Sequence, residues 1–210
     1  MSQVASPLEL NAVLRPGSSG VVRIELLGED GRLLIRKVVQ FAANLENRVS
    51  LQENLDFGIS AVAETGRLQI STEDGYGRIT ALASVELLLI SVGNSDVNPP
   101  GSSMEPIVIR EPGEKTLIQG GKLVVSGITN TGGTQPLLVE LIASDGRIVG
   151  YRQASITGPA EGYDGGYFRF SAEVSYQVNS ATWVRLTVKA YQDILPGPTH
   201  ISSYEILLGP

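Results

Sequence analysis

The chain contains one sequence pattern twice, and this repeat decides the fold. Residues 6–34 read SPLELNAVLRPGSSGVVRIELLGEDGRLL, residues 121–149 read GKLVVSGITNTGGTQPLLVELIASDGRIV, and the two segments align without a gap. Each contains an apolar run with Glu-Leu at its centre, followed by the turn sequence Asp-Gly-Arg at Asp30–Arg32 or Asp145–Arg147. Two copies separated by a domain's length indicate a tandem array of one fold.

The repeat extends beyond the quoted segments. Leu8 aligns with Leu123, and most other aligned apolar positions exchange Ile, Leu and Val, as in the pairs Val13/Ile128, Val22/Leu137, Ile24/Val139 and Leu33/Ile148. The closing segments also correspond, because Ser84–Leu89 aligns with Ser203–Leu208. The pattern therefore predicts two modules of about 100 residues each, a common domain size.

Apolar residues alternate with polar ones in most of these segments, as in Val22/Ile24/Leu26 and Val184/Leu186/Val188. Alternation with a period of two places the apolar side chains on one face of a β-strand. Asp-Gly sequences between such runs favour tight hairpin turns. About seven short strands per module predict an all-β chain of two β-sandwiches. The only helix candidate is the segment around Phe41–Leu51.

The predicted domains are residues 1–95 and 107–210, joined by the polar, proline-rich linker 96–106. The second domain opens with Pro106–Thr116, which precedes its aligned segment, whereas the first begins almost directly at its own. We therefore expect the first domain to lack its first strand and the natural protein to extend upstream. The exposed sheet edge that this leaves could pair with a neighbouring chain or with the linker.

Composition excludes several classes of function. The net charge is −6, and residues 1–95 and 96–210 each hold 8 basic and 11 acidic side chains. This even acidity argues against nucleic acid or an anionic membrane surface as a partner. The sequence contains no run of 18 apolar residues, so no membrane span is predicted. The first residues carry no signal-peptide pattern. Cysteine is absent, which excludes disulfides and thiolate chemistry.

Nothing in the sequence has the pattern of a catalytic site. His200 is the only histidine, and we interpret it as a surface residue of a loop or strand end. Nucleophile-elbow, phosphate-loop and zinc-protease motifs are absent. Asp164, Glu161 and Asp193 offer oxygen ligands for calcium, but they form no alternating Asp array, and ordinary turn chemistry accounts for them better. We expect no enzyme activity, no cofactor and no metal site.

Aromatic residues are concentrated in the second domain. Phe168, Phe170 and Trp183 are predicted to lie in its core, because large aromatics dominate sandwich cores. Tyr163 instead lies within the Gly-rich segment 158–166, Tyr167 directly follows it, and the segment also carries Glu161 and Asp164. Exposed aromatics beside carboxylates can stack on sugar rings or bind a protein partner. These four residues are the candidate ligand-binding site; the alternative is that the tyrosines cover one end of the sandwich.

The second domain resembles the bacterial spore-germination immunoglobulin-like domain. The resemblance is carried by four motifs in order, followed by a closing strand that ends at Leu208: Ile107–Gly113, Lys122–Gly127, Val139–Leu141 with the Asp145–Arg147 hairpin, and a Gly-rich stretch that leads into Gly166–Phe170. The first domain looks like a more divergent copy, from about Val4 to Val92. The resemblance implies two tandem immunoglobulin-like sandwiches, an extracytoplasmic location at a bacterial surface or envelope, and no catalysis.

Three functions remain open at this point. The first is a non-catalytic pair of surface modules that serves as a spacer and a protein-interaction unit. The second is a module that binds carbohydrate or peptidoglycan through the aromatic loop of the second domain. The third is a pair of accessory domains in a larger envelope hydrolase.

Overall fold

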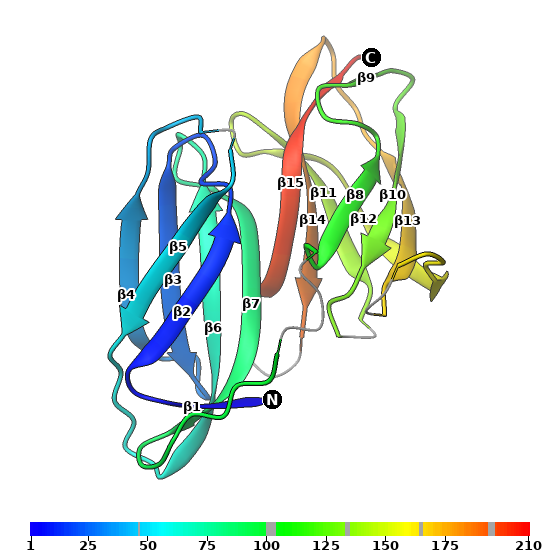
Figure 1. The fold of residues 1–210 in the computed structure, drawn as a ribbon. Helices are drawn as coiled ribbons and strands as arrows, with labels where there is room; N and C mark the ends of the chain where they lie inside the picture. The colour runs from blue at the N-terminus through cyan, green and yellow to red at the C-terminus, as the bar shows by residue number, and fades with distance from the viewer. Residues whose placement is uncertain (46, 100–103, 133–134, 164–165, 193–195) are drawn as a thin grey trace. The chain divides into compact units, whose positions relative to one another are not determined.

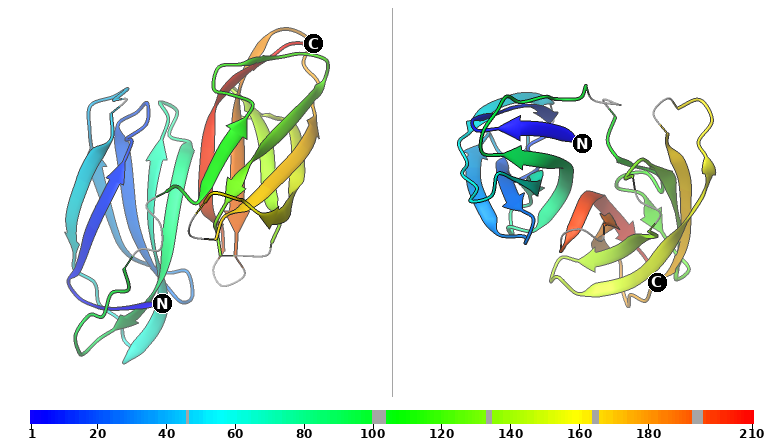
Figure 2. Two further views of the ribbon diagram at one scale, coloured as in Figure 1. Left: turned by 45° about the vertical axis from the view of Figure 1, so that its right-hand side comes forward. Right: turned by 90° about the horizontal axis from the view of Figure 1, so that it is seen from below.

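The computed structural model describes residues 1–210 except 46, 100–103, 133–134, 164–165 and 193–195. The described chain is built from β-strands, with no helix among these residues. It divides into two compact units (Figure 1; Figure 2): unit 1 contains Met1–Pro100, and unit 2 contains Gly101–Gln192 and Gly197–Pro210. No helix among the described residues is long and apolar enough to cross a membrane.

Unit 1 has two layers of strands. One layer has the order β4-β3-β6-β7, with β1 parallel to β7, and the other is the antiparallel pair β2-β5. The bounds are β1 (Ser2–Ala5), β2 (Leu8–Leu14), β3 (Val21–Gly28), β4 (Leu33–Gln40), β5 (Val49–Leu55), β6 (Ala63–Glu73) and β7 (Ile79–Ile90).

Unit 2 repeats this arrangement with one further strand. Its first layer has the order β12-β11-β14-β15, with β9 parallel to β15, and its second layer has the order β13-β10-β8. The long β12 also pairs with β13 and so joins the layers. The bounds are β8 (Ile107–Glu111), β9 (Leu117–Ile118), β10 (Lys122–Thr129), β11 (Leu137–Ala143), β12 (Ile148–Pro159), β13 (Phe168–Ser175), β14 (Thr182–Tyr191) and β15 (Pro198–Leu208).

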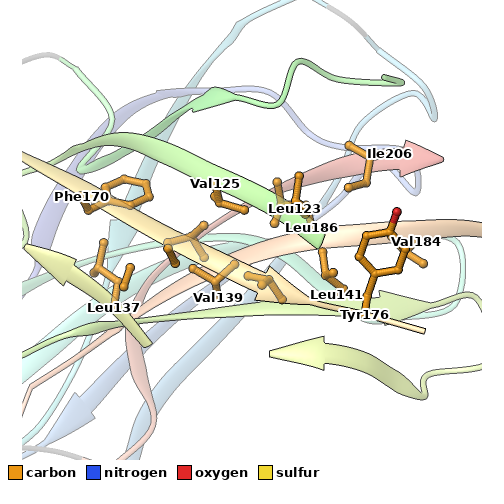
Figure 3. Packing of buried hydrophobic residues seen from close by; sticks show 14 of the residues in the cluster. Leu123, Val125, Leu137, Val139, Leu141, Phe170, Tyr176, Val184, Leu186 and Ile206 are labelled. Atoms are coloured by element: carbon orange, nitrogen blue, oxygen red, sulfur yellow. The ribbon is translucent and has the colours of Figure 1, made fainter. Parts of the chain in front are cut away.

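Period-two alternation produces a core between the layers of each unit. In unit 2, Val125 of β10 and Phe170 of β13 face Val139 of β11 and Leu186 of β14, and all four are buried (Figure 3). In unit 1, Leu51 and Leu55 of β5 pack in one cluster with Ile24, Leu68 and Leu89. Burying such a side chain contributes about 1.5–3 kcal/mol, so these rows hold the layers together.

The two Asp-Gly-Arg sequences form matching hairpin turns, as predicted. They connect β3 to β4 and β11 to β12. The Oδ1 atom of Asp30 accepts a hydrogen bond from the Arg32 N–H at 3.1 Å, and Asp145 accepts one from Arg147 at 3.0 Å. The glycine between them has φ of 77° at Gly31 and 85° at Gly146, values that a side chain would disfavour.

The one helix candidate does not form a helix, and two predictions about core aromatics are wrong. Residues 41–51 contain no helix in their described part, because Asn44 has a left-handed φ of 56° and β5 begins at Val49. Trp183 is 49% exposed, since it points away from the face of β14 that buries Val184. Phe168 is 44% exposed at the end of β13, whereas Phe170 is fully buried.

Part of the predicted linker is attached to unit 1. Gln3 of β1 and Asp96 exchange two backbone hydrogen bonds of 2.9 and 2.8 Å. The Ser95 hydroxyl accepts a hydrogen bond from the Ala5 N–H, and the Ser2 hydroxyl accepts one from the Asn98 N–H, both at 3.0 Å. Residues 94–98 therefore extend the folded part of unit 1 along β1.

Candidate functional site

The candidate tyrosines lie in the turn that connects β12 to β13. The Ala160 N–H donates to the Tyr167 carbonyl at 2.8 Å, and this hydrogen bond closes the base of the turn. Gly162 and Gly166 have left-handed φ values of 79° and 74°, which the reversal of the chain requires. Glu161 is exposed. Asp164, the fourth candidate residue, lies outside the described residues.

Tyr167 is a core residue. Its exposed fraction is 2%, and it packs with Ile128 of β10 and Ala160. Its hydroxyl lies 3.3 Å from the Met104 carbonyl oxygen and 3.2 Å from that of Glu105, so the phenol anchors the chain just before β8. A ring buried in this way has no free face on which a sugar could stack.

Tyr163 is more accessible, and an arginine covers one face of its ring. It is partly buried, and its ring centroid lies 6.2 Å from that of Tyr167 with an interplanar angle of 57°. The guanidinium carbon of Arg110, on β8, lies 4.8 Å from the Tyr163 centroid, and the Arg110 Nη2 also donates to the Tyr163 hydroxyl. A cation–π contact at this distance stabilises an exposed pair by about 0.5–1 kcal/mol.

The structure thus brings Tyr163 and Tyr167 together and gives them different roles. Tyr167 fixes the turn to the sandwich, and Tyr163 with Arg110 forms the accessible part. Sequence reasoning missed Arg110, because it is 53 residues from Tyr163 and on a different strand. The arrangement can present guanidinium N–H donors and the edge of a phenol to a partner.

His200 lies near the start of β15, which agrees with the strand-end alternative, but it is buried and not a surface residue as predicted. It is a buried residue of β15, in register with Ala190 of β14, and its Nδ1 lies 3.2 Å from the Thr199 hydroxyl. The Thr199 hydroxyl in turn donates to the Ala190 carbonyl at 3.3 Å. Among the described residues, no group of three or more His, Asp and Glu side chains could hold a metal ion. Asp193, one of the calcium candidates, lies outside the described residues.

Buried carboxylates in unit 1 are paired with arginines of the same sheet. Glu25 of β3 lies 2.6 Å from Arg36 of β4 and accepts a hydrogen bond from Gln69 of β6 at 2.7 Å. Glu64 accepts from Arg32 at 2.7 Å, and Glu73 pairs with Arg23. Each pair crosses between neighbouring strands or the turn beside them, so these charges connect strands.

Each unit has a surface hollow lined by strand residues. The hollow in unit 2 has a volume of about 620 Å³ and is lined by Pro136 and by residues 151–155 of β12. The hollow in unit 1 has a volume of about 420 Å³ and is lined by Lys37, by residues 9–11 of β2 and by residues 52–54 of β5. Neither hollow includes the candidate tyrosines.

Comparisons with known proteins add little to this description. No protein-family model matches the chain, and no curated protein matches it. Among solved structures, the crystal structure of CBD12 from CALX1.2 matches with 9% sequence identity and a TM-score of 0.21. The match covers 91% of this chain and 79% of that one. A TM-score this low carries no argument about function.

Proposed function

We propose that the chain is a pair of tandem immunoglobulin-like modules, related to the spore-germination immunoglobulin-like domains, that acts as a spacer and protein-interaction unit at a bacterial surface or envelope. The observation that carries the proposal is the repeated strand order. In each unit a short strand, β1 or β9, runs parallel to the last strand, β7 or β15. A repeated scaffold is typical of proteins that span distance and present surfaces.

The use of charge in the scaffold supports a non-catalytic role. Catalytic carboxylates must face a substrate in a cleft. Glu25, Glu64 and Glu73 are instead committed to arginines beside them in the sheet. In unit 2, Lys189 of β14 lies 2.5 Å from Glu140 of β11. This carboxylate is likewise paired with a cation on a neighbouring strand.

A second candidate function is binding of cell-wall glycan through the turn between β12 and β13. The observation in its favour is the exposed Arg110 stacked on Tyr163, because guanidinium groups and aromatic rings both bind sugars. The buried position of Tyr167 removes it from such a site. The glycan site would therefore consist of Tyr163, Arg110 and Glu161.

Co-sedimentation with purified bacterial sacculi separates these functions. The full chain would be compared with Tyr163→Ala and with Tyr76→Ala, an equally simple change of an exposed tyrosine that also stacks with an arginine. Under the leading proposal none of the three sediments with sacculi, and a pull-down from native envelope extract captures a protein. Retention that only Tyr163→Ala abolishes would replace the leading proposal with the glycan one.

The third function, accessory domains of a larger hydrolase, is tested by the open reading frame. A catalytic domain encoded in the same frame would establish it. Under the leading proposal the frame encodes further non-catalytic modules or an envelope anchor.

A further inference from the structure

Strand β2 of unit 1 has one unpaired edge. It pairs with β5 along its whole length, from Leu8 opposite Leu55 to Leu14 opposite Val49. On its other edge, the described part of the chain provides neither a strand nor a backbone hydrogen bond. The aligned strand of unit 2, β10, lies between β13 and β8. The same position in the repeat is therefore covered in unit 2 and open in unit 1.

The open edge leaves apolar surface incompletely buried. The inward residues Leu10, Ala12 and Leu14 are only half-buried, whereas the corresponding Val125, Gly127 and Thr129 are buried. The contrast is largest on the outward side, where Val13 is 67% exposed and the aligned Ile128 is 1% exposed. Exposed strand edges with apolar neighbours are sites where another chain can add a strand.

A strand with the path of β8 does not fit this edge. β8 has an irregularity in register opposite Ser126 and Gly127 that brings the Val108 carbonyl oxygen to 2.2 Å from the place of a Cβ on residue 127. Glycine allows this approach, but unit 1 has Ala12 at the aligned position. The edge of β2 therefore requires a strand that follows a regular, straight path.

β2 is itself such a strand, since it pairs with β5 without a register shift, and its inward apolar positions coincide when two copies are placed antiparallel. We propose that β2 pairs antiparallel with β2 of a second copy of this chain, with Asn11 of the two copies opposite each other. This proposal rests on the interaction role proposed above and names the partner. All seven residues overlap in this register: Leu10 lies opposite Ala12 of the second copy, and Leu8 lies opposite Leu14.

The register matches both faces of the strand. The residues that face the core in one copy lie beside those of the other, so the two β2-β5 pairs merge into one four-stranded layer. On the outward face, Glu9 lies opposite Val13, and the two Glu9 carboxylates are roughly 14 Å apart at a rise of about 3.4 Å per residue. No like charges are opposed, and the two-fold symmetry closes the assembly as a dimer.

Charge changes at Val13 test the pairing, because this side chain is exposed and its replacement leaves the core intact. Val13→Lys places a cation opposite Glu9 of the second copy, and Val13→Glu places a like charge there. Two such pairs form in a symmetric dimer, so we expect the dimer dissociation constant to fall about threefold or more with Lys and to rise about threefold or more with Glu. Sedimentation equilibrium over a range of concentrations measures both.

The matched controls are Val62→Lys and Val62→Glu, since Val62 is also exposed in unit 1 and lies outside β2. These changes should leave the dissociation constant unaltered. The double variant with Glu9→Lys and Val13→Glu restores opposite charges and should dimerise about as well as Val13→Lys. A chain that stays monomeric, or a dimer indifferent to the charge at position 13, overturns the proposal.

Cross-linking tests the register directly, because the chain contains no cysteine. Asn11→Cys places two thiols opposite each other, within the Cα separation of about 4.4–6.8 Å that a disulfide spans. Val13→Cys places them four residues apart along the strands, beyond that range. Rapid oxidation to a covalent dimer with Asn11→Cys alone supports the pairing. Equal rates, or faster cross-linking at position 13, would contradict it.

The failure of self-pairing and the failure of the proposed function can be told apart. A monomeric chain that captures an envelope protein would overturn self-pairing and leave the module role in place. A dimeric chain whose open reading frame also encodes a catalytic domain would support self-pairing and overturn the proposed function.

Discussion

The guanidinium of Arg110 lies 4.8 Å above the ring of Tyr163 and joins β8 to the turn between β12 and β13. Beneath it, Tyr167 is buried and holds the chain before β8 through two carbonyl oxygens. The end of unit 2 is therefore a layered structure, with Tyr167 in the packed layer and Tyr163 with Arg110 in the outer layer. The two tyrosines should respond differently to mutation.

Tyr167→Ala should destabilise the chain strongly. Truncating a buried aromatic side chain leaves a cavity and costs about 3–5 kcal/mol. Tyr163→Ala removes a partly exposed ring and a surface cation–π contact, and should cost about 1 kcal/mol. Urea denaturation followed by the fluorescence of the single tryptophan, Trp183 of unit 2, measures both.

Tyr167→Phe serves as the control for the hydroxyl. It retains the packing and loses only the contacts with the carbonyls of Met104 and Glu105, so the expected loss is about 1 kcal/mol. If Tyr167→Ala proved no more damaging than Tyr163→Ala, Tyr167 could not be a core residue as described.

Gly127→Ala should destabilise unit 2 by about 3 kcal/mol. A Cβ at this position would lie 2.2 Å from the Val108 carbonyl oxygen and 2.7 Å from two ring atoms of Phe170. Both contacts are far inside van der Waals distance, so β8 or the Phe170 ring must move, and overpacking of this kind typically costs 1–3 kcal/mol or more. Gly158→Ala is the matched control, since an added Cβ there meets nothing within 4 Å.

The converse change in unit 1, Ala12→Gly, should behave differently. Ala12 lies opposite Leu51, whereas Gly127 lies opposite the larger Phe170. Removing the methyl group should lower stability by about 1 kcal/mol through the greater freedom of glycine in a strand.

The control for Gly127→Ala also has a contrary outcome. A loss of stability at Gly127→Ala no larger than that at Gly158→Ala would mean that β8 is loosely attached.

The sequence allowed the strands and the hairpins to be predicted, because alternation and Asp-Gly turns are local signals. The exposure of Trp183 could also be predicted from the sequence, because Trp183 does not share the alternate positions of Val184, Leu186 and Val188 and so belongs to the opposite face of the strand. The general tendency of large aromatics to be buried predicts the opposite, and at this position the alternation of the strand outweighs it. Phe168 has the same parity as Phe170, but how far a core extends along a strand is not a local property.

The contacts of the candidate site could not be predicted in the same way. Arg110 and Tyr163 meet because β8 pairs with β10 and because the turn after β12 lies over that edge. Pairings of this kind depend on the tertiary fold, and no periodicity in either segment signals them. The burial of Tyr167 has the same origin, since it packs on Ile128 from a strand 39 residues earlier.

Tyr204 should make stability sensitive to high pH. Burial, with a smaller contribution from the charge of Glu114, raises the pKa of Tyr204 to about 12, and its hydroxyl donates to the Pro112 carbonyl. Between pH 10 and 12 the unfolded chain loses this proton while the folded chain keeps it. Stability due to this group is therefore complete below pH 10 and is lost as the pH rises through about 12.

The test compares the wild-type chain with Tyr204→Phe by urea denaturation between pH 9 and 12. The variant should be less stable by about 1 kcal/mol at pH 9, because it lacks the hydrogen bond to Pro112. Its stability should then fall less steeply than that of the wild type. Parallel curves for the two proteins would mean that Tyr204 ionises equally easily in the folded and unfolded chains.

Asp74 should make unit 1 sensitive to acid. Burial acts to raise the pKa of Asp74, but hydrogen bonds from the N–H groups of Arg78 and Tyr76 and the guanidinium of Arg78 outweigh it and hold the pKa below its usual value. The folded chain therefore releases this proton at a lower pH than the unfolded chain. The stability that follows is present above about pH 4 and is lost as the pH falls through the folded pKa.

Asp74→Asn should therefore cost about 2 kcal/mol at pH 7, where charged hydrogen bonds are lost, and should flatten the acid limb of the stability curve. Asp145→Asn is the matched control: Asp145 occupies a similar turn, but its side chain is 60% exposed, so its replacement should change stability little at any pH. Thermal melts between pH 2.5 and 7 would measure both. If Asp74→Asn unfolded at acid pH as steeply as the wild type, the pKa of Asp74 would not be a cause of the acid sensitivity of unit 1.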